Sequence, residues 1–270
     1  MDYENLVQLD ADHPGFRDAQ YRARRDLIAS VAHDYRRGDE VPQVEYTAAE
    51  HQLWRQIDAE LADRHRDWAC REILEARARL ALPSDRIPQL AEVNLSLAQT
   101  GGFRMEPVAG LIDGTVFLRA LAGGVFLSTQ YIRHTSRPCY TPEPDVVHEL
   151  QGHAATLADA RFAQLSRAFG EAAATAPSGR HREIERLYWY TLEYGCVMES
   201  GRPKAVGAGL LSSVDEITHV GGGVEIRPFR AAVAAGTDYD PTNFQPVLFM
   251  ATSFEDLLAE CHDWLSRVTI

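Results

Sequence analysis

The sequence has few cysteines, no long apolar run and a deficit of positive charge. Its four cysteines are widely spaced over 270 residues and form no C-x-x-C pair, so a disulfide framework is not expected. No stretch approaches the roughly 20 apolar residues that a membrane-spanning helix needs. The 39 acidic and 27 basic side chains give a formal charge of −12, which repels nucleic acid and anionic membranes. We therefore expect neither a nucleic-acid partner nor a membrane.

The start of the chain also lacks the basic region and the apolar region that make a secretory signal peptide. A cytoplasmic location is therefore expected. The sequence contains no G-x-S-x-G elbow, no P-loop and no glycine fingerprint for dinucleotides. The sequence therefore does not favour a serine hydrolase with a G-x-S-x-G elbow, nor one of the common nucleotide-binding folds.

Helical periodicity dominates what is present. Apolar residues at three-and-four spacing predict a helix from about Arg17 to Arg37, and Thr47 followed by Glu50 predicts a capping box that opens a second helix. Further helices are expected over residues 70–82, 87–90 and onward, 146–150, 160–174, 182–197 and 253–265.

Glycine-rich segments interrupt this helical pattern. Residues 100–139 alternate like strands or compact loops, and residues 206–227 are expected to hold a small hairpin. No repeat or linker is visible. We predict a mostly α fold with a small β component, forming one domain over residues 1–270 whose first 16 residues are extended.

The segment TPEPDVVHELQGHAA carries two histidines five residues apart, His148 and His153. The zinc-peptidase motif H-E-x-x-H uses a spacing of four, which places both rings on one face of an α-helix. A spacing of five separates the rings by about 140° on a regular helix. A shared metal ion therefore requires a distorted helix, and Gly152 is the residue expected to permit the distortion.

A third metal ligand is expected from elsewhere in the chain. A facial iron site takes two histidines and one carboxylate and keeps its remaining positions open. Glu193 is the acidic residue inside the apolar part of IERLYWYTLEYGCV, where an unpaired carboxylate would be costly to bury. Two alternatives stay open: the histidines as ordinary surface or core residues, and a buried ion pair of Glu193 with Arg186 or Arg133.

Several segments resemble the pterin-dependent aromatic amino acid hydroxylases. TQYIRHTSRPCYTPEPDVVHELQGH is followed by YWYTLEYG and GAGLLSS, while LDADHPGF, YRARR, VPQVEYT, IPQL, TGGFR, PVAGLI and NFQP occur in the family's order. The resemblance covers nearly the whole chain. It implies a catalytic domain that binds Fe(II) and uses tetrahydrobiopterin and O2 to hydroxylate the ring of an aromatic amino acid. It also implies a monomer, as in compact bacterial members.

The resemblance further implies roles for individual residues. His148, His153 and Glu193 match the iron ligands. Arg133 matches the arginine that binds the amino acid carboxylate, and Asp145 matches the acid that orients it. A guanidinium suits this task because it offers two parallel donors to a carboxylate.

Other matched residues surround the substrate and the pterin. Thr141, Gly209 and Ser212 match groups near the substrate carboxylate. Pro144 and Trp189 match walls of the ring pocket, and Cys139 stands beside it where members often carry a bulkier side chain. Gly110, Leu111, Ile112 and Phe117 match the loop and ring that contact the pterin. Glu149 matches a carboxylate that faces the pterin near the metal, so Glu149 and Trp189 are expected closest to the chemistry.

The substrate expected from these matches is L-phenylalanine, with tyrosine as product. Trp189 favours phenylalanine or tyrosine, because tryptophan hydroxylases usually have phenylalanine at that position. Cys139, Ala154 and Ala155 are smaller than is common in the family, and a wider pocket would re-aim the ring. Hydroxylation to meta-tyrosine and a tryptophan substrate therefore stay open as alternatives.

Two functions of other classes, a zinc hydrolase and a non-catalytic binding protein, compete with the hydroxylase function. A zinc hydrolase would use Glu149 as its general base, but the histidine spacing and the matched Arg133 oppose it. A non-catalytic binding protein of the same fold is opposed by the presence of all three metal ligands. Three departures from the family, Leu127, Asp113 and Gly114, lie in the pterin region and are expected to affect pterin affinity or preference.

Overall fold

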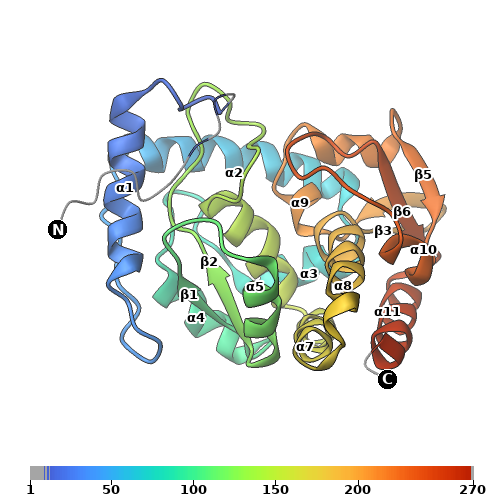
Figure 1. Cartoon of the computed structure of the whole chain (residues 1–270). Helices are drawn as coiled ribbons and strands as arrows, with labels where there is room; N and C mark the ends of the chain where they lie inside the picture. The colour runs from blue at the N-terminus through green and yellow to red at the C-terminus, as the bar shows by residue number, and fades with distance from the viewer. Residues whose placement is uncertain (1–8, 10, 12, 269–270) are drawn as a thin grey trace.

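The computed structural model describes residues 9, 11 and 13–268 of the chain (Figure 1). The longer helices are α1 Ala19–His33, α2 Ala48–Trp68, α3 Arg71–Leu80, α4 Leu90–Gln99, α5 Gly114–Ala122, α7 Ala160–Thr175, α8 His181–Tyr188 and α11 Phe254–Val268. Short α-helices are α6 Ala155–Leu157, α9 Ala208–Leu211 and α10 Ala231–Ala235. Two segments are π-helices, η1 His148–Ala154 and η3 Trp189–Glu193, and two are 3₁₀-helices, η2 Ser178–Arg180 and η4 Glu216–Gly221.

The predicted helix starts are confirmed where the sequence carries a capping residue. Thr47 and Glu50 form the expected capping box at the start of α2, with each side chain bonded to the other residue's backbone N–H. Asp18 caps α1 and Asp159 caps α7 without a capping box, each side chain accepting from two backbone N–H groups. Side-chain capping thus sets where three of the longest helices begin.

Two small sheets make up the β component. Strands β1 Arg104–Pro107 and β2 Val125–Ser128 form a parallel pair. The second sheet has the order β4-β3-β6-β5, with β3 Cys196–Glu199, β4 Arg202–Ala205, β5 Glu225–Pro228 and β6 Val247–Ala251. Only β3 and β4 are antiparallel in it, and Ser200 and Gly201 turn between them with positive φ.

The sequence-based predictions fail in the glycine-rich parts. The hairpin lies at residues 196–205, whereas residues 206–227 form α9, η4 and part of β5. Residues 100–139 contain the helix α5 as well as strands, because Asp113 caps a short amphipathic segment there. The helix expected over 182–197 ends at Glu193, since Gly195 packs directly against the carbonyl of Thr191 and strand β3 begins at Cys196.

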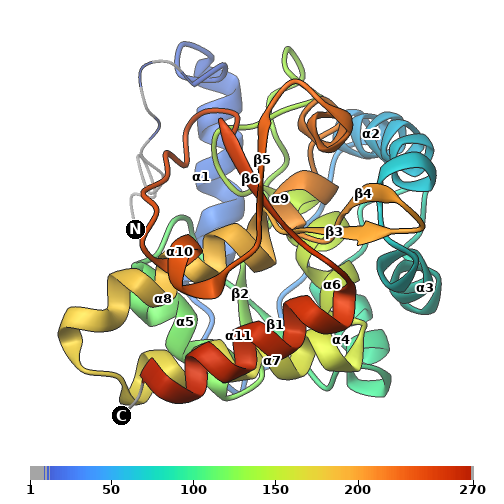
Figure 2. The same ribbon diagram turned by 90° about the vertical axis from the view of Figure 1, so that its right-hand side faces the viewer.

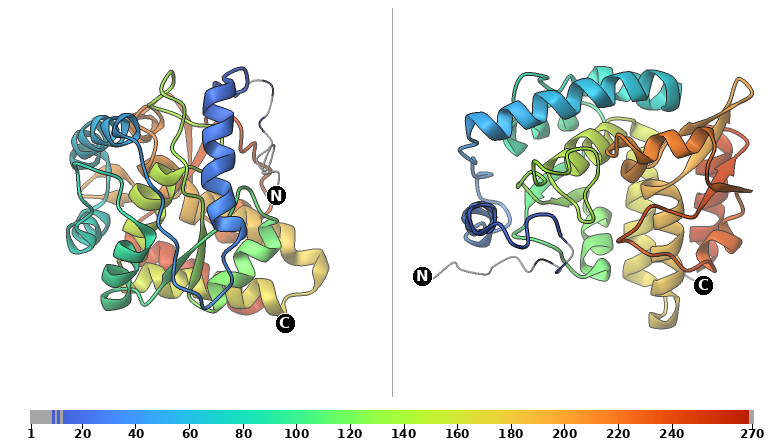
Figure 3. Two further views of the ribbon diagram at one scale, coloured as in Figure 1. Left: turned by 90° about the vertical axis from the view of Figure 1, so that its left-hand side faces the viewer. Right: turned by 90° about the horizontal axis from the view of Figure 1, so that it is seen from above.

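A large apolar core joins the helices to both sheets. Helix α7 packs between α5 and α11, and Figure 2 shows α7 and α11 running below the four-stranded sheet. Helix α1 stands on one flank and α2 crosses the molecule nearby (Figure 3). The four cysteines are free thiols, as expected. No helix within the described residues is long and apolar enough to cross a bilayer.

Candidate active site

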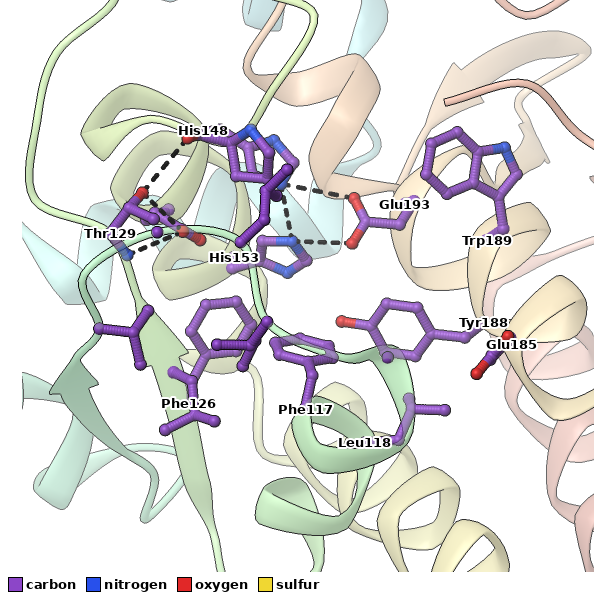
Figure 4. A pocket seen from close by; sticks show the side chains of 18 of the residues that line it. Phe117, Leu118, Phe126, Thr129, His148, His153, Glu185, Tyr188, Trp189 and Glu193 are labelled. Carbon is purple, nitrogen blue, oxygen red and sulfur yellow. Dashed lines mark hydrogen bonds and ion pairs between the residues drawn. The ribbon is translucent and has the colours of Figure 1, made fainter. Parts of the chain in front are cut away.

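The two histidines and Glu193 meet at one point. The Nε2 atoms of His148 and His153 lie 3.0 Å apart. The carboxylate of Glu193 faces both rings, with 3.0 Å from Oε1 to His153 Nε2 and 3.5 Å from Oε2 to His148 Nε2. Figure 4 shows the three side chains turned toward one another above the rings of Phe117 and Tyr188. Neither Arg186 nor Arg133 pairs with Glu193, because they pair with Asp238 and Asp145.

Both parts of the backbone that carry these side chains are π-helical. In a π-helix each residue bonds to the residue five positions away, so side chains five apart lie above one another. This explains how His148 and His153 in η1 share a face despite their spacing. Glu193 ends the second π-helix, η3.

Gly152 has a different role from the one expected. Its φ is not in the left-handed region, so the distortion does not depend on glycine's conformational freedom. A Cβ at Gly152 would lie 2.7 Å from the carbonyl oxygen of Ala208. Similarly, a Cβ at Gly207 would lie 2.2 Å from the carbonyl of Glu193. The two glycines therefore let α9 pack directly against both metal-binding π-helices.

The three donors fit a metal ion. Donors at right angles on an ion with bonds of about 2.1 Å lie about 3.0 Å apart, close to the spacing found here. Burial lowers the pKa of His148 to about 4, so its ring is in the neutral form that binds metals. Burial opposes charge on His153 and Glu193 as well. Their mutual attraction nevertheless raises the pKa of His153 and lowers that of Glu193. A metal ion held between these groups would supply the positive charge that the Glu193 carboxylate attracts.

Hydrogen bonds fix the orientation of His148. Its Nδ1 lies 2.9 Å from the hydroxyl of Ser212, which leaves Nε2 directed at the other donors. The backbone N–H of His148 donates to Asp145 Oδ1 at 3.1 Å. Asp145 in turn receives two parallel bonds from Arg133, Nε at 2.9 Å and Nη2 at 2.7 Å. Arg133, Asp145 and Ser212 thus form one buried network behind the first metal ligand.

Glu149 is oriented separately from the metal donors. Its Oε1 accepts from both the backbone N–H and the hydroxyl of Thr129, each at 3.0 Å. Burial raises the pKa of Glu149 to about 7. Ligand atoms of Glu149 and both histidines lie within 4.8 Å of one another. Glu193 is the better placed third donor, because it faces both Nε2 atoms while Glu149 is held by Thr129.

A cavity of about 200 Å³ opens from the metal site. Phe117 lies in its wall and makes edge contacts with Phe126 and Tyr188, at 5.2 and 5.7 Å between ring centroids. The same wall also contains small and aliphatic residues, namely Val108, Gly110, Leu111, Ile112, Gly114, Leu118 and Leu127. Leu111 and Ile112 are exposed and mark the mouth of the cavity, whereas Leu118 is buried.

Trp189 forms the opposite wall of the cavity. Its ring stacks on Tyr239 with a centroid distance of 4.2 Å and an angle of 10° between planes. The indole N–H donates to the side-chain oxygen of Gln245 at 2.9 Å. Trp189 is also the first residue of η3, so this wall and the ligand Glu193 share one short segment.

A family model for biopterin-dependent aromatic amino acid hydroxylases matches residues 2–269. The chain belongs to this hydroxylase family. The match and the donor geometry support the predicted resemblance, and they oppose the zinc-hydrolase alternative.

Other hydroxylases resemble the chain over most of its length. It is 43% identical over 265 residues to tyrosine 3-monooxygenase of Bos taurus, covering 96% of this chain and 54% of that protein. It is 41% identical over 269 residues to phenylalanine-4-hydroxylase of Caenorhabditis elegans, covering 97% and 58%. The chain thus spans about half the length of the curated relatives that it matches.

Solved hydroxylase structures have the same fold. The apo structure of the cold-active phenylalanine hydroxylase from Colwellia psychrerythraea matches with a TM-score of 0.79 and 30% identity, covering 85% of this chain and 92% of that one. Phenylalanine hydroxylase from Chromobacterium violaceum with bound iron(III) and oxidized cofactor 7,8-dihydrobiopterin matches with a TM-score of 0.76 and 30% identity, covering 83% and 82%.

The structure places most hydroxylase residues expected from the sequence around the cavity. His148, His153 and Glu193 line the cavity. So do the other matched residues Glu149, Pro144, Trp189, Phe117, Gly110, Leu111 and Ile112. Arg133, Asp145 and Ser212 lie directly behind His148. Thr141 is half-buried in the segment that leads to Asp145. A Cβ at Gly209 would lie 2.7 Å from the ring of Tyr194, so this glycine allows close packing beside Glu193.

Cys139 lies close to Glu60 of α2, with 3.7 Å between its Sγ and a carboxylate oxygen, and like Arg133 it is not among the side chains that line the cavity. Gln151 of η1 is buried and bonded to Asp58 of α2 and Arg77 of α3. Ala154 and Ala155 also belong to the core. The three small residues are thus absent from the described cavity lining, and the position of hydroxylation stays a prediction.

Several residues that shape the site carry no recognisable signal in the sequence. Thr129 orients Glu149, Tyr239 stacks on Trp189, and Gln245 accepts from the indole. Tyr188 and Phe126 enclose the metal end. Periodicity could not identify them, because aromatic and small polar residues are by default structural. The NFQP segment did contain Gln245, but its contact with Trp189 depends on the tertiary fold.

Proposed function

We propose that the chain is an Fe(II)- and tetrahydrobiopterin-dependent monooxygenase that hydroxylates the ring of L-phenylalanine to give tyrosine. The proposal rests on one observation: two imidazoles and a carboxylate converge at the inner end of a largely apolar cavity. A facial set of three donors leaves other positions on the ion free for exchangeable ligands. Family membership makes iron the metal and a biopterin the cosubstrate.

His148, His153 and Glu193 would hold the iron. With iron and reduced pterin bound, these groups would supply the activation of O2 that ring hydroxylation requires. The protein's part is to position the reactants and to exclude water from them. Phe117 would stack on the pterin ring, while Gly110, Leu111 and Ile112 would contact its edge and Glu149 would face it near the metal.

Arg133 would bind the substrate carboxylate. It is buried, and Asp145 holds one edge of its guanidinium. Its Nη1 donates to the carbonyls of Pro138 and Ser212 at 3.2 Å each. A substrate carboxylate would exchange such neutral contacts for a stronger charge-assisted bond. Thr141 and Gly209 would complete this end of the binding site.

The ring would lie between Pro144 and Trp189. Trp189 directs its N–H away to Gln245 and therefore presents an apolar face to the cavity. An unsubstituted phenyl ring fits such a wall, whereas the hydroxyl of tyrosine or the N–H of tryptophan would need a partner there. This favours phenylalanine over the other aromatic amino acids.

A direct assay tests the function. Purified protein is incubated with Fe(II), tetrahydrobiopterin, O2 and either phenylalanine, tyrosine or tryptophan. Chromatography that separates ortho, meta and para products should show tyrosine from phenylalanine as the main product. Meta-tyrosine or 5-hydroxytryptophan as the main product would replace the substrate or position proposed. Absence of any pterin-dependent product would remove the oxygenase proposal.

We further propose that the chain acts as one catalytic domain, as a monomer, in the reducing environment of the cytoplasm. Four free thiols, three of them buried, suit a reducing compartment. Light scattering of the purified protein checks the monomer, since a dimer would double the expected mass of 30.1 kDa.

A further inference from the structure

Gln245 connects the cavity wall to the loop that follows α10. Its side-chain oxygen accepts from Trp189 Nε1 at 2.9 Å. Its side-chain nitrogen donates to the carbonyls of Asp240 and Asn243, at 2.8 and 2.9 Å. Only 3% of the residue is exposed, so these bonds are sheltered from water. Every polar atom of this side chain is therefore committed to one geometry.

Glu216 holds Gln245 from the other side. This carboxylate belongs to η4, is 1% exposed, and its Oε1 accepts from the backbone N–H of Gln245 at 2.7 Å. Its Oε2 is buried and has no hydrogen-bond partner among the described residues. Burying a carboxylate with a single hydrogen bond is costly. Among the described residues, the Glu216 carboxylate accepts its hydrogen bond from Gln245. Burial of Glu216 is therefore coupled to the position of Gln245.

The loop between α10 and β6 brings a second contact to the same wall. Tyr239 lies in this loop, lines the cavity and stacks on Trp189. Stacking of two flat rings resists tilting but leaves sliding and rotation in the ring plane comparatively free. A directional hydrogen bond to the indole N–H removes that freedom. Gln245 thus supplies the restraint that Tyr239 cannot.

We propose that Gln245, held by Glu216, is a positioning residue that fixes Trp189 and thereby determines which ring carbon of the substrate is hydroxylated. This inference rests on the proposed function. The substrate ring lies against Trp189, and the carbon nearest the metal reacts. If the Trp189 ring can shift, a neighbouring carbon of the substrate ring reaches the reacting position in some turnovers. In other turnovers no ring carbon reaches it. The expected signs of a lost restraint are mixed products and pterin oxidation without hydroxylation.

The first experiment compares Gln245→Met with the wild-type enzyme. Methionine has a similar length but cannot accept strongly from the indole. The meta and ortho fraction and the uncoupled pterin oxidation should each rise by about tenfold, while iron content and the KM for tetrahydrobiopterin stay within about twofold. Asn243→Ser is the matched control, since Gln245 contacts only the backbone of Asn243. Unchanged product ratio and coupling in Gln245→Met would overturn the proposal.

A double-mutant cycle separates positioning from general destabilisation. Trp189→Phe removes the N–H that Gln245 accepts. If Gln245 acts through this bond, adding Gln245→Met to Trp189→Phe changes the product ratio no further. Full additivity of the two effects would overturn the proposal.

The role of Glu216 is tested by two substitutions. Glu216→Gln keeps an oxygen for the Gln245 N–H and should retain the wild-type product ratio, whereas Glu216→Ala should resemble Gln245→Met. The NMR signal of the Trp189 indole N–H, assigned by its loss in Trp189→Phe, gives a readout independent of turnover. It should shift in Gln245→Met and Glu216→Ala but not in Glu216→Gln. An unmoved signal in Gln245→Met would contradict the bond itself.

The two proposals fail in different ways. A wild-type protein that forms no hydroxylated product from any aromatic amino acid refutes the proposed function, and the role of Gln245 with it. A wild-type protein that hydroxylates phenylalanine, together with a Gln245→Met variant of unaltered product ratio, refutes the role alone.

Discussion

The inner end and the mouth of the cavity are built in opposite ways. At the inner end, Glu193, His148 and His153 are held by rigid backbone and by bonds to one another or to Ser212. At the mouth, Leu111 is 70% exposed and Ile112 is 36% exposed. The first region is held together by bonds within the protein. The second contains apolar surface that a ligand would cover.

This difference separates two kinds of residue in one site. A side chain of the inner end contributes to metal binding and to folding, because its partners are buried and would be left unpaired. A side chain of the mouth contributes mainly through contact with a ligand. Substitutions at the inner end should therefore change iron binding and the free energy of unfolding. Substitutions at the mouth should mainly change the affinity for a ligand.

The largest effect is expected from Glu193→Ala. This change removes one of three donors and leaves two imidazoles to hold the ion, so iron retention should be lost and hydroxylation should fall by at least about 1,000-fold. Metal analysis after gel filtration and product assays measure both. Glu183→Ala, a partly exposed acid on α8 that pairs with Arg180 and is not among the residues lining the cavity, is the control. Iron bound at one equivalent in Glu193→Ala would remove the ligand assignment.

The second largest effect is expected for the pair of Arg133 and Asp145. Asp145→Asn leaves a buried guanidinium without its counter-charge, which should cost about 3–5 kcal/mol of unfolding free energy. Arg133→Ala should destabilise similarly and should also raise the KM for phenylalanine. Urea unfolding and steady-state kinetics test these two consequences. An Arg133→Ala enzyme with an unaltered KM would show that Arg133 supports the fold without binding the substrate.

A smaller effect concerns pH. Burial raises the pKa of Glu216 to about 7, from about 4.5 in an unfolded chain. The folded protein then binds more protons than the unfolded one, so this contribution is present below about pH 4.5 and is lost as the pH rises to about 7. Glu216→Gln should remove it. Relative to the variant, the wild type should lose roughly 2–3 kcal/mol of unfolding free energy between pH 5 and pH 8. Parallel urea curves for the two proteins would contradict the shift.

The smallest effect on stability is expected at the mouth. Leu111→Ser removes an exposed side chain, so the unfolding free energy should change by less than about 0.5 kcal/mol. Binding of 7,8-dihydrobiopterin, measured by calorimetry, should nevertheless weaken by about threefold to tenfold through lost apolar contact. A large loss of stability without weaker binding would reverse the comparison between the two ends.

The parts of the molecule predictable from sequence are those with local physical causes. The capping box at Thr47 and Glu50 defined the start of α2, and apolar spacing indicated the main helices. Family motifs located the metal ligands. Periodicity failed where tertiary packing decides: it could not distinguish a π-helix from an α-helix at His148, nor foresee that Gly207 and Gly209 serve close packing instead of a turn. Contacts such as Gln245 with Trp189 join segments 56 residues apart, which local patterns do not specify.

The π-helix η1 takes up one residue more between its two histidines than an α-helix would need. An α-helical turn with one residue fewer would align two histidines at a spacing of four, as in zinc peptidases. The π-helix absorbs the extra residue in wider turns, so five residues turn the chain about as far as four do in an α-helix. His153 and the short helix α6 that follows therefore keep the phase set by His148. Deleting Leu150 would return the segment to the spacing of four, and its main cost would be the loss of one buried apolar side chain from the core.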